Sequence, residues 1–334
     1  VHTGIQAFDD LVMGGFPRGR ATIVAGTPGS GKTVFAMQFL VHGIRDAAEP
    51  GVFVTFEEPS AEISANMSSF GWSVSRWCAE KKLAFVDASP RDRSEMVIGD
   101  FDLVGLLARI LHACENVKAK RVVLDSLTQL FDHFVTDERT IRRELLRIAS
   151  ALKQAGLTVL MTAERDSEYG AISRHRVEEF VADNVVILRN SLERERRRRT
   201  IEVLKMRGSR HVEGEVPITL VTTQGIVAIP LSSLRLEQHS STKRVTSGTP
   251  ELDAMCNGGF FRDSITLVSG PTGSGKTLLV TSFLAGGVGA NEKSLLIGYE
   301  ESRGQLFRNA RSWGVDFEAM EAARVELAQQ LAHA

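Results

Sequence analysis

The sequence predicts an α/β fold with a mostly parallel central sheet, duplicated along the chain, the second copy being incomplete. Three observations lead to this prediction. Short apolar runs alternate with helical patterns, a glycine-rich phosphate-binding motif occurs twice, and four blocks of sequence recur in the same order. The 334 residues, of which 43% are hydrophobic and 24% charged, suit a globular chain of about two domains at about 150 residues each.

Hydrophobic spacing predicts the elements of the first copy in order. Ser60 is the expected N-cap of one helix, and Gly156 is the expected end signal of another. We expect strands at 22–25, 52–56, 83–86, 121–124, 157–162, 184–188, 200–206 and 218–222, and helices at 34–44, 60–70, 103–114 and 139–155.

The repeat relates the start of the chain to its last quarter. TIVAGTPGSGKT at 22–33 corresponds to TLVSGPTGSGKT at 266–277, and VTFEE at 54–58 corresponds to IGYEE at 297–301. The predicted organisation is a first domain at 1–233, a linker at 234–246 and the N-terminal part of a second domain at 247–334. We expect the second sheet to lack its later strands and leave edges exposed, and the final run at 325–334 to be a helix end.

The segment GTPGSGKT at 26–33 matches G-x-x-x-x-G-K-[ST] and lies between a predicted strand and a predicted helix. In such a loop the backbone N–H groups approach phosphates, the lysine reaches the β and γ phosphates, and the last hydroxyl coordinates Mg²⁺. The motif predicts nucleotide binding but not the reaction. The expected nucleotide-binding residues are Thr27, Gly29, Ser30, Gly31, Lys32 and Thr33 in the first copy, and Thr272, Gly273, Ser274, Gly275, Lys276 and Thr277 in the second, with Thr33 and Thr277 as metal ligands.

An aspartate is expected beside the first loop. RVVLDS at 121–126 is an apolar strand that ends in Asp125, which is the Walker B pattern. The pattern by itself is weak, but it gains weight from its position after the phosphate loop. The carboxylate of Asp125 is therefore expected to hold the Mg²⁺ of the nucleotide.

Two glutamates end the strand that follows the loop helix. Glu57 and Glu58 could orient and deprotonate a water molecule, or could only cap the next helix. The second copy repeats the pair as Glu300 and Glu301, which favours the catalytic interpretation. This position of the acidic pair is typical of RecA-type ATPases.

Two basic segments follow late in the first copy. Lys205 and Arg207 are two residues apart and would project to one face of a strand. They could complete the active site of a neighbouring subunit, like an arginine finger, or form a basic hairpin tip, and the spacing favours neither. The run ERERRRR at 193–199 is interpreted as a solvated face of a strand or hairpin.

Charge and cysteine usage exclude several classes of protein. The 40 basic and 41 acidic residues leave a net charge of −1, which argues against nucleic-acid binding by bulk charge. Three widely spaced cysteines form no disulfide framework and fit a reducing cytoplasm. No apolar run approaches 18 residues and the first residues show no signal-peptide pattern, so we expect a cytoplasmic protein without a membrane partner.

The sequence resembles the KaiC family of circadian clock ATPases from its start to about residue 322. The first copy carries the resemblance in GTPGSGKT (26–33), VTFEE (54–58), SFGW (69–72), VDASP (86–90), YGAISRHRVEEFVADNVVILRN (169–190) and LKMRGSRHVEGE (204–215). In the second copy YEESRGQLFRNARSWG (299–314) adds to it. The resemblance is far more specific than a phosphate loop alone.

The resemblance implies a RecA-like P-loop ATPase that forms a homohexamer of two rings, with ATP and Mg²⁺ between neighbouring subunits. It implies catalytic roles for Glu57 and Glu58, a place near the nucleotide for Ser69, and the same carboxylate role for Glu300 and Glu301. The residues implied to reach ATP across the subunit interface are Lys205, Met206, Arg207, Ser209 and His211.

The resemblance also implies partners and a second activity for full-length relatives. Their second ring is a serine/threonine autokinase, but its acceptor residues lie beyond residue 334 in register, so we expect no autokinase activity of this chain. A KaiB-like protein could dock on the first domain near 97–103. Two alternative functions remain open, a RecA-type nucleic-acid-dependent ATPase and a non-catalytic scaffold assembled by ATP. The first would need a basic inner loop and a DNA-binding domain, and the glutamate pair argues against the second.

Overall fold

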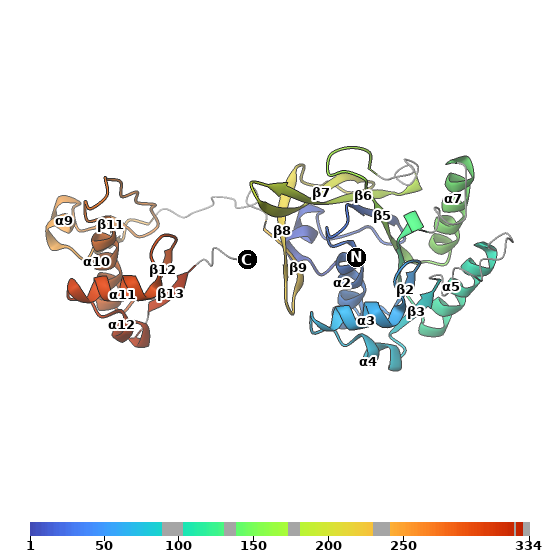
Figure 1. Cartoon of the computed structure of the whole chain (residues 1–334), viewed down its shortest axis with the longest axis horizontal. Coiled ribbons are helices and arrows are strands. Elements are labelled where there is room, and N and C mark those ends of the chain that lie inside the picture. Colours follow the sequence, from blue (N-terminus) through green and yellow to red (C-terminus); the bar gives the residue numbers. More distant parts are fainter. Residues whose placement is uncertain (89–102, 130–137, 173–180, 230–240, 324, 330–334) are drawn as a thin grey trace. The chain divides into compact units, whose positions relative to one another are not determined.

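A computed structural model describes residues 1–88, 103–129, 138–172, 181–229, 241–323 and 325–329 of the chain (Figure 1). The chain divides into two compact units, Val1–Leu234 and Arg235–Ala334. The first unit is built on a nine-stranded sheet, and the second contains two two-stranded sheets. None of the helices in these segments has the length and apolar character needed to cross a bilayer.

Strands and helices of the first unit alternate, and each strand or helix expected from hydrophobic spacing overlaps an observed one. The strands are β1 (Ala21–Gly26), β2 (Gly51–Thr55), β3 (Leu83–Asp87), β4 (Arg121–Asp125), β5 (Thr158–Glu164), β6 (Asn184–Glu193), β7 (Arg196–Met206), β8 (Glu215–Val221) and β9 (Gly225–Ala228). The helices are α1 (Gln6–Leu11), α2 (Lys32–Asp46), α3 (Ser60–Ser68), α4 (Val74–Ala79), α5 (Leu103–Val117) and α7 (Glu138–Gln154). The predicted α/β class is confirmed.

The sheet has the strand order β3-β2-β4-β5-β1-β6-β7-β8-β9. The strands from β3 to β6 are parallel, whereas β6, β7, β8 and β9 pair antiparallel. Arg194 and Glu195 join β6 to β7 and both have positive φ, the backbone twist that a two-residue hairpin turn requires. The carboxyl ends of β1, β2, β4 and β5 therefore lie side by side at one end of the strands, here called the carboxyl edge of the sheet. Ligands of parallel sheets bind at this end.

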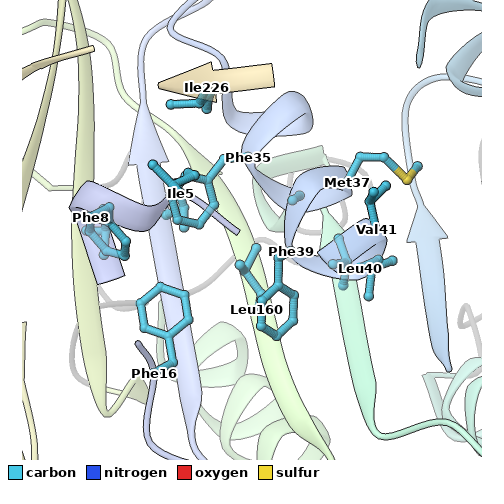
Figure 2. Packing of buried hydrophobic residues seen from close by; sticks show 14 of the residues in the cluster. Ile5, Phe8, Phe16, Phe35, Met37, Phe39, Leu40, Val41, Leu160 and Ile226 are labelled. Atoms are coloured by element: carbon cyan, nitrogen blue, oxygen red, sulfur yellow. The ribbon is translucent and has the colours of Figure 1, made fainter. Parts of the chain in front are cut away.

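Both faces of the parallel part of the sheet are buried. In β1, Ala21, Ile23 and Ala25 face the core beneath α5 and α7, while Val24 faces the core beneath α2. This alternation follows from the two-residue period of a strand. Figure 2 shows the α2 side, where four phenylalanines gather with Leu160 of β5. They are Phe8, Phe16, Phe35 and Phe39, and their rings contact one another edge-to-face or tilted.

Two expected helix ends can be compared with the structure. The prediction that Ser60 is the N-cap of α3 is wrong, because Pro59 occupies the N-cap and Ser60 is the first helical residue. The Ser60 amide donates instead to Asp87 Oδ2 at 3.4 Å, so a carboxylate from β3 serves the unpaired amide. Gly156 follows α7 with a φ of 75°, the left-handed conformation expected after a helix end.

The second unit keeps only part of the repeated pattern. Its elements are β10 (Arg244–Val245), α9 (Pro250–Met255), β11 (Phe260–Phe261), α10 (Lys276–Gly289), β12 (Ser294–Gly298), α11 (Arg303–Ser312), α12 (Phe317–Ala323) and β13 (Val325–Gln329). Residues 264–270, the counterpart of β1, form no strand, and Ile265 and Leu267 are 96% and 88% exposed. The reason is that β1 pairs with β5 and β6, and the described residues of this unit supply no equivalents of those two strands.

The expected helix at the end of the chain is wrong for the residues that the structure describes there. Val325–Gln329 is a strand, β13, which pairs in parallel with β12 from Ser294 to Gly298. A two-stranded pairing supplies partners for backbone groups along one edge of β12 that a helix would leave without partners. Residues 330–334 lie outside the described residues.

Candidate active site

The phosphate loop connects β1 to α2 at the carboxyl edge of the sheet. Gly29 and Gly31 have φ values of 73° and 102°, which curl the backbone so that its amides converge on one point. Lys32 begins α2, and its Nζ donates to the carbonyls of Gly26 at 3.0 Å and Thr27 at 3.1 Å. The lysine therefore closes over a concave, amide-lined cradle at a helix N-terminus, a geometry that binds phosphate.

One buried hydroxyl in this cradle fits an anionic oxygen. Ser30 is fully buried, and its Oγ has no hydrogen-bond partner among the described residues. A buried hydroxyl is normally paired, because leaving it unpaired is costly. The loop thus has a donor to offer besides its amides and the Lys32 ammonium group.

Two side chains from later in the chain, Glu168 after β5 and Arg199 in β7, contact the loop. Thr27 Oγ1 donates to Glu168 Oε1 at 2.6 Å, and Glu168 Oε2 accepts the backbone N–H of Asn190 at 3.0 Å. Arg199 Nε of β7 donates to the carbonyl of Gly29 at 3.1 Å. The basic run at 193–199, interpreted from sequence as a solvated face, therefore also supplies one residue that contacts the phosphate loop.

Asp125 ends β4 next to the loop, as the Walker B pattern predicts. Its carboxylate is buried and accepts hydrogen bonds from the hydroxyls of Thr162 in β5 and Thr33 in α2. Burial raises the pKa of Asp125, and the two hydroxyl donors oppose this shift by favouring the ionised form. Thr33 and Asp125, the two expected metal ligands, are thus in direct contact.

Glu57 and Glu58 follow the end of β2 at the same edge. Thr55, the last residue of β2, lies opposite Asp125 in the parallel register, and the Phe56 amide donates to the Asp125 carbonyl at 2.9 Å. The Thr55 hydroxyl donates to the Glu58 carbonyl at 2.6 Å, which fixes the turn after the strand. Both glutamate side chains are exposed and open toward solvent.

The electrostatics of this edge couple one lysine to several carboxylates. Burial lowers the pKa of Lys32, and Glu164, Asp125, Glu57 and Glu168 oppose that shift. Loss of hydration raises the pKa of Glu57, and the charges of Glu164 and Asp125 raise it further. Crowded negative charge next to a single ammonium group favours a divalent cation.

Glu164 also lies at the candidate site, together with Thr162, Glu168 and Arg199, and none of the four was predicted from the sequence. Glu164 ends β5 and lies opposite Gly26 of β1, with its amide donating to Thr128 Oγ1 at 2.8 Å. An acidic residue at the end of an apolar strand, the signal that identified Asp125, was available here as well. The spacing of apolar residues does not predict the order of the strands in the sheet, in which β5 lies between β1 and β4.

The segment from Lys205 to His211 lies at the opposite edge of the sheet. Met206 pairs with Asn184 of β6, which pairs with Thr22 near the start of β1, whereas the phosphate loop follows Gly26 at its end. The four residue-to-residue steps from Thr22 to Gly26 span about 13 Å at about 3.3 Å per step. The structure therefore separates these residues from the phosphate loop of their own chain.

The remaining predicted residues of this edge are also held in place, in part by contacts with the start of the chain. Met206 is buried, and Ser209 Oγ donates to the carbonyl of Val12 at 3.3 Å. His211 is half-buried, and the next amide, of Val212, donates to the carbonyl of Leu11 at 2.9 Å. The segment is thus attached to the end of α1 as well as to β6.

Ser69 follows the end of α3. Its hydroxyl donates to the carbonyl of Asn66 at 2.8 Å and is exposed, so this hydrogen bond stays within the α3 region. The adjoining Phe70 and Trp72 rings stack at 5.1 Å, and a Cβ at Gly225 would lie 2.7 Å from the Trp72 ring. The SFGW segment therefore packs on the turn between β8 and β9.

The second phosphate loop repeats the local geometry of the first. Gly275 precedes α10 with a φ of 86°, and Lys276 Nζ donates to the carbonyls of Gly270 and Pro271, both at 2.8 Å. Glu300 is exposed, and Glu301 Oε2 accepts a hydrogen bond from Asn309 Nδ2 at 3.1 Å. The other predicted residues of this loop, all exposed except the half-buried Thr277, are Thr272, Gly273, Ser274 and Thr277.

Comparison with known proteins identifies the family of this chain. The family model described as the KaiC ATPase matches residues 1–233 and 245–331. The chain is 57% identical over 322 residues to the circadian clock protein KaiC3 of Synechocystis, covering 96% of this chain and 63% of that protein. It is 53% identical over 321 residues to the circadian clock oscillator protein KaiC of Synechococcus elongatus, covering 96% of this chain and 62% of that protein. The chain thus spans under two thirds of the length of these relatives. It belongs to the KaiC family of ATPases.

Proposed function

We propose that the first unit hydrolyses ATP, with Mg²⁺, between neighbouring subunits of a homohexamer. The observation that carries the proposal is the placement of two predicted half-sites at opposite edges of one sheet. The phosphate loop and its carboxylates lie at the carboxyl edge, and the segment from Lys205 to His211 lies at the other. A single copy of the chain therefore carries both half-sites but holds them apart, so that a complete site needs two copies.

In the first half-site, the amides of Gly29 to Gly31, the Ser30 hydroxyl and Lys32 bind the phosphates. Within the described segments no three His, Cys, Asp or Glu side chains form a metal-binding cluster. Mg²⁺ suits this arrangement, because it is usually held by one or two protein ligands together with nucleotide phosphates. Thr33 and Asp125 would hold the ion, which supplies charge neutralisation at the β and γ phosphates.

The glutamate pair supplies the proton acceptor. Glu57 is the better candidate for general base, because its raised pKa brings its basicity closer to that needed to take a proton from water. Glu58 lies beside it and adds negative charge. Water activated by Glu57 attacks the γ phosphate in line with the bond to the β phosphate, and Lys32 stabilises the charge that develops.

The second half-site comes from the neighbouring subunit. Lys205 and Arg207 approach the phosphates there, with Met206, Ser209 and His211 lining the same surface, and Ser69 lies near the nucleotide in the first half-site. Charged donors aimed at a transferring phosphoryl group lower the barrier substantially, so removal of Arg207 should cost on the order of 10³-fold in kcat.

Further proposals concern the second unit and the partners. Thr272 to Thr277 would bind a second nucleotide, with Glu300 and Glu301 as its carboxylates, and the full-length protein would also be a serine/threonine autokinase. We propose a cytoplasmic protein with a role in a circadian clock or a related signalling system. A KaiB-like partner would dock on the first unit near 97–103, of which residues 97–102 lie outside the described residues.

Complementation between two impaired variants tests the shared site. Arg207→Ala removes the second half-site, and the double change Glu57→Gln with Glu58→Gln removes catalysis from the first. Each variant alone should have little activity, and Arg207→Ala should keep about a thousandth of the wild-type kcat. An equal mixture, assembled with ATP, should recover about a quarter of wild-type activity, because about one interface in four joins two intact half-sites.

Native mass and nucleic-acid dependence complete the test. A hexamer should appear with Mg-ATP, and a mixture without recovered activity would contradict a site shared between subunits. Activity stimulated by single-stranded DNA, with a salt-dependent affinity for it, would favour a nucleic-acid-dependent ATPase instead.

A further inference from the structure

Asp183 immediately precedes β6, next to the segment that carries Lys205 and Arg207. Its side chain is almost fully buried, and it accepts three hydrogen bonds from elements distant in sequence. They come from the Ala21 amide at 3.1 Å, Arg20 Nη1 at 3.0 Å and Lys153 Nζ at 2.8 Å. The carboxylate is thus fixed by the start of β1 and by the end of α7.

The three residues from Ala182 to Asn184 also hold the two cationic residues of the proposed second half-site. Lys205 Nζ donates to the Ala182 carbonyl at 2.8 Å. The Arg207 amide is shared between the Asp183 carbonyl at 3.3 Å and Asn184 Oδ1 at 3.2 Å. Asn184 is itself buried, and its Nδ2 donates to Thr22 Oγ1 at 2.9 Å.

The Arg207 guanidinium lies 4.0 Å from the Asp183 carboxylate, while its side chain is 57% exposed. An ion pair of this length at the surface is weak and leaves the donors of Arg207 available to another molecule, while the backbone of Arg207 is held by Asp183 and Asn184. Arg20, Lys153 and Arg207 place three positive charges around the one negative charge of Asp183, a surplus of two. This edge of the sheet is therefore suited to an anionic ligand.

We propose that Asp183 is a positioning residue for ATP hydrolysis at the neighbouring subunit, which it supports by orienting Arg207. The proposal rests on the proposed function and deepens it. Burial disfavours the charge of Asp183, but hydrogen bonds from Lys153 and the Ala21 amide outweigh this effect and lower its pKa, so the carboxylate is ionised at neutral pH. Without it, Arg207 samples more rotamers, and fewer of them point toward the phosphates.

The first experiment replaces Asp183 by Asn in the full chain. We expect kcat for ATP hydrolysis to fall about ten-fold, with little change in the affinity for ATP, because the phosphate loop is at the other edge. In a double-mutant cycle, Asp183→Asn should add nothing to the loss caused by Arg207→Ala. Two losses that multiply would overturn the proposal, since Asp183 would then act independently of Arg207.

Mixed assemblies assign Asp183 to one half-site. A mixture of Asp183→Asn with the Glu57→Gln, Glu58→Gln variant should be more active than the average of the two proteins, because the glutamate variant supplies an intact second half-site. A mixture of Asp183→Asn with Arg207→Ala should have only the average activity, because both proteins are altered in the same half-site. The reverse pattern would place Asp183 with the phosphate loop and overturn the proposal. If Arg207→Ala does not complement the glutamate variant, the shared site itself is wrong, and the double-mutant cycle still decides whether Asp183 acts through Arg207.

Glu49→Gln is the matched control, because it also neutralises one buried carboxylate at this edge of the sheet, paired with Arg121 at the start of β4. It should lower the thermal midpoint while kcat per folded molecule stays unchanged. If Asp183→Asn does not fold, Asp183→Glu takes its place, since it keeps the buried negative charge and shifts the carboxylate relative to the Arg207 guanidinium. It should lower kcat with little change in the affinity for ATP, and an unchanged kcat would contradict the proposal.

Discussion

The hydroxyl of Thr27 in the phosphate loop donates a 2.6 Å hydrogen bond to the carboxylate of Glu168, 141 residues later in the chain. The other oxygen of this carboxylate accepts the Asn190 amide at 3.0 Å. Glu168 therefore connects the phosphate loop to β6, and both of its oxygens act as acceptors.

Glu168→Gln should weaken ATP binding about ten-fold, because a glutamine supplies only one acceptor oxygen and a hydrogen bond to a charged group is worth about 1.5–3 kcal/mol. Titration with a fluorescent ATP analogue measures the effect. Ser167→Ala, next in sequence and exposed, serves as the control and should bind as wild type. Equal affinity of the Glu168 variant and the wild type for ATP would show that the hydrogen bonds of Glu168 do not determine the conformation of the phosphate loop.

Gly26→Ala should abolish nucleotide binding at the first loop. A Cβ at Gly26 would lie 2.6 Å from the Leu188 carbonyl of β6 and would overlap the Ser30 hydroxyl, so either the strand or the loop must move. Gly304→Ala is the control, since a Cβ there meets nothing within 4 Å. Isothermal titration with ATP, together with the thermal midpoint, measures both effects, and normal binding by the Gly26 variant would contradict this close approach.

The ion pair between Glu49 and Arg121 predicts a loss of stability in acid. Burial raises the pKa of Glu49, but hydrogen bonds from Arg18 and Arg121 outweigh burial and hold the pKa below its ordinary value of 4.5. A carboxyl with a lowered folded-state pKa contributes stability that is complete above its unfolded pKa and is lost as the pH falls through the folded value. We therefore expect the contribution to be constant above about pH 4.5 and to decline below it.

Urea unfolding between pH 7 and pH 3 measures this decline. Glu49→Gln should cost about 3 kcal/mol at pH 7, because Arg121 is left buried without its charged partner, and its stability should depend less on pH than that of the wild type. Parallel pH curves for the two proteins would contradict the prediction.

Cys114 should resist alkylation in the folded protein. Cys114 lies on the buried face of α5, and burial, with Glu115 adding to the effect, raises its pKa to about 12, so very little thiolate is present at pH 7.5. Mass spectrometry after treatment with iodoacetamide, with and without urea, should find Cys114 modified only when the chain is unfolded. Rapid modification under native conditions would show that α5 opens locally.

Much of the candidate site was predictable because its signals are local in sequence. A strand, five loop residues and a helix start place Lys32 and Thr33 at a helix N-terminus, and this geometry needs no distant contact. Asp125 was identified in the same way, from an apolar strand that ends in an acid. The α/β class followed from the spacing of apolar residues, because strand and helix periods are properties of the local backbone.

Strand order and register were decided only by the tertiary structure, since they depend on pairing between segments far apart in the chain. They place Glu164 opposite Gly26 and bring Glu168 to Thr27, and neither relationship has a local signal. They also determine the edge at which Lys205 and Arg207 lie. Strand partners likewise decide local structure in the second unit, where the counterpart of β1 stays unpaired and Val325–Gln329 becomes a strand. The amino-acid sequence by itself determined the chemistry of the phosphate loop, whereas the long-range pairing of backbone groups decided which other residues share its edge.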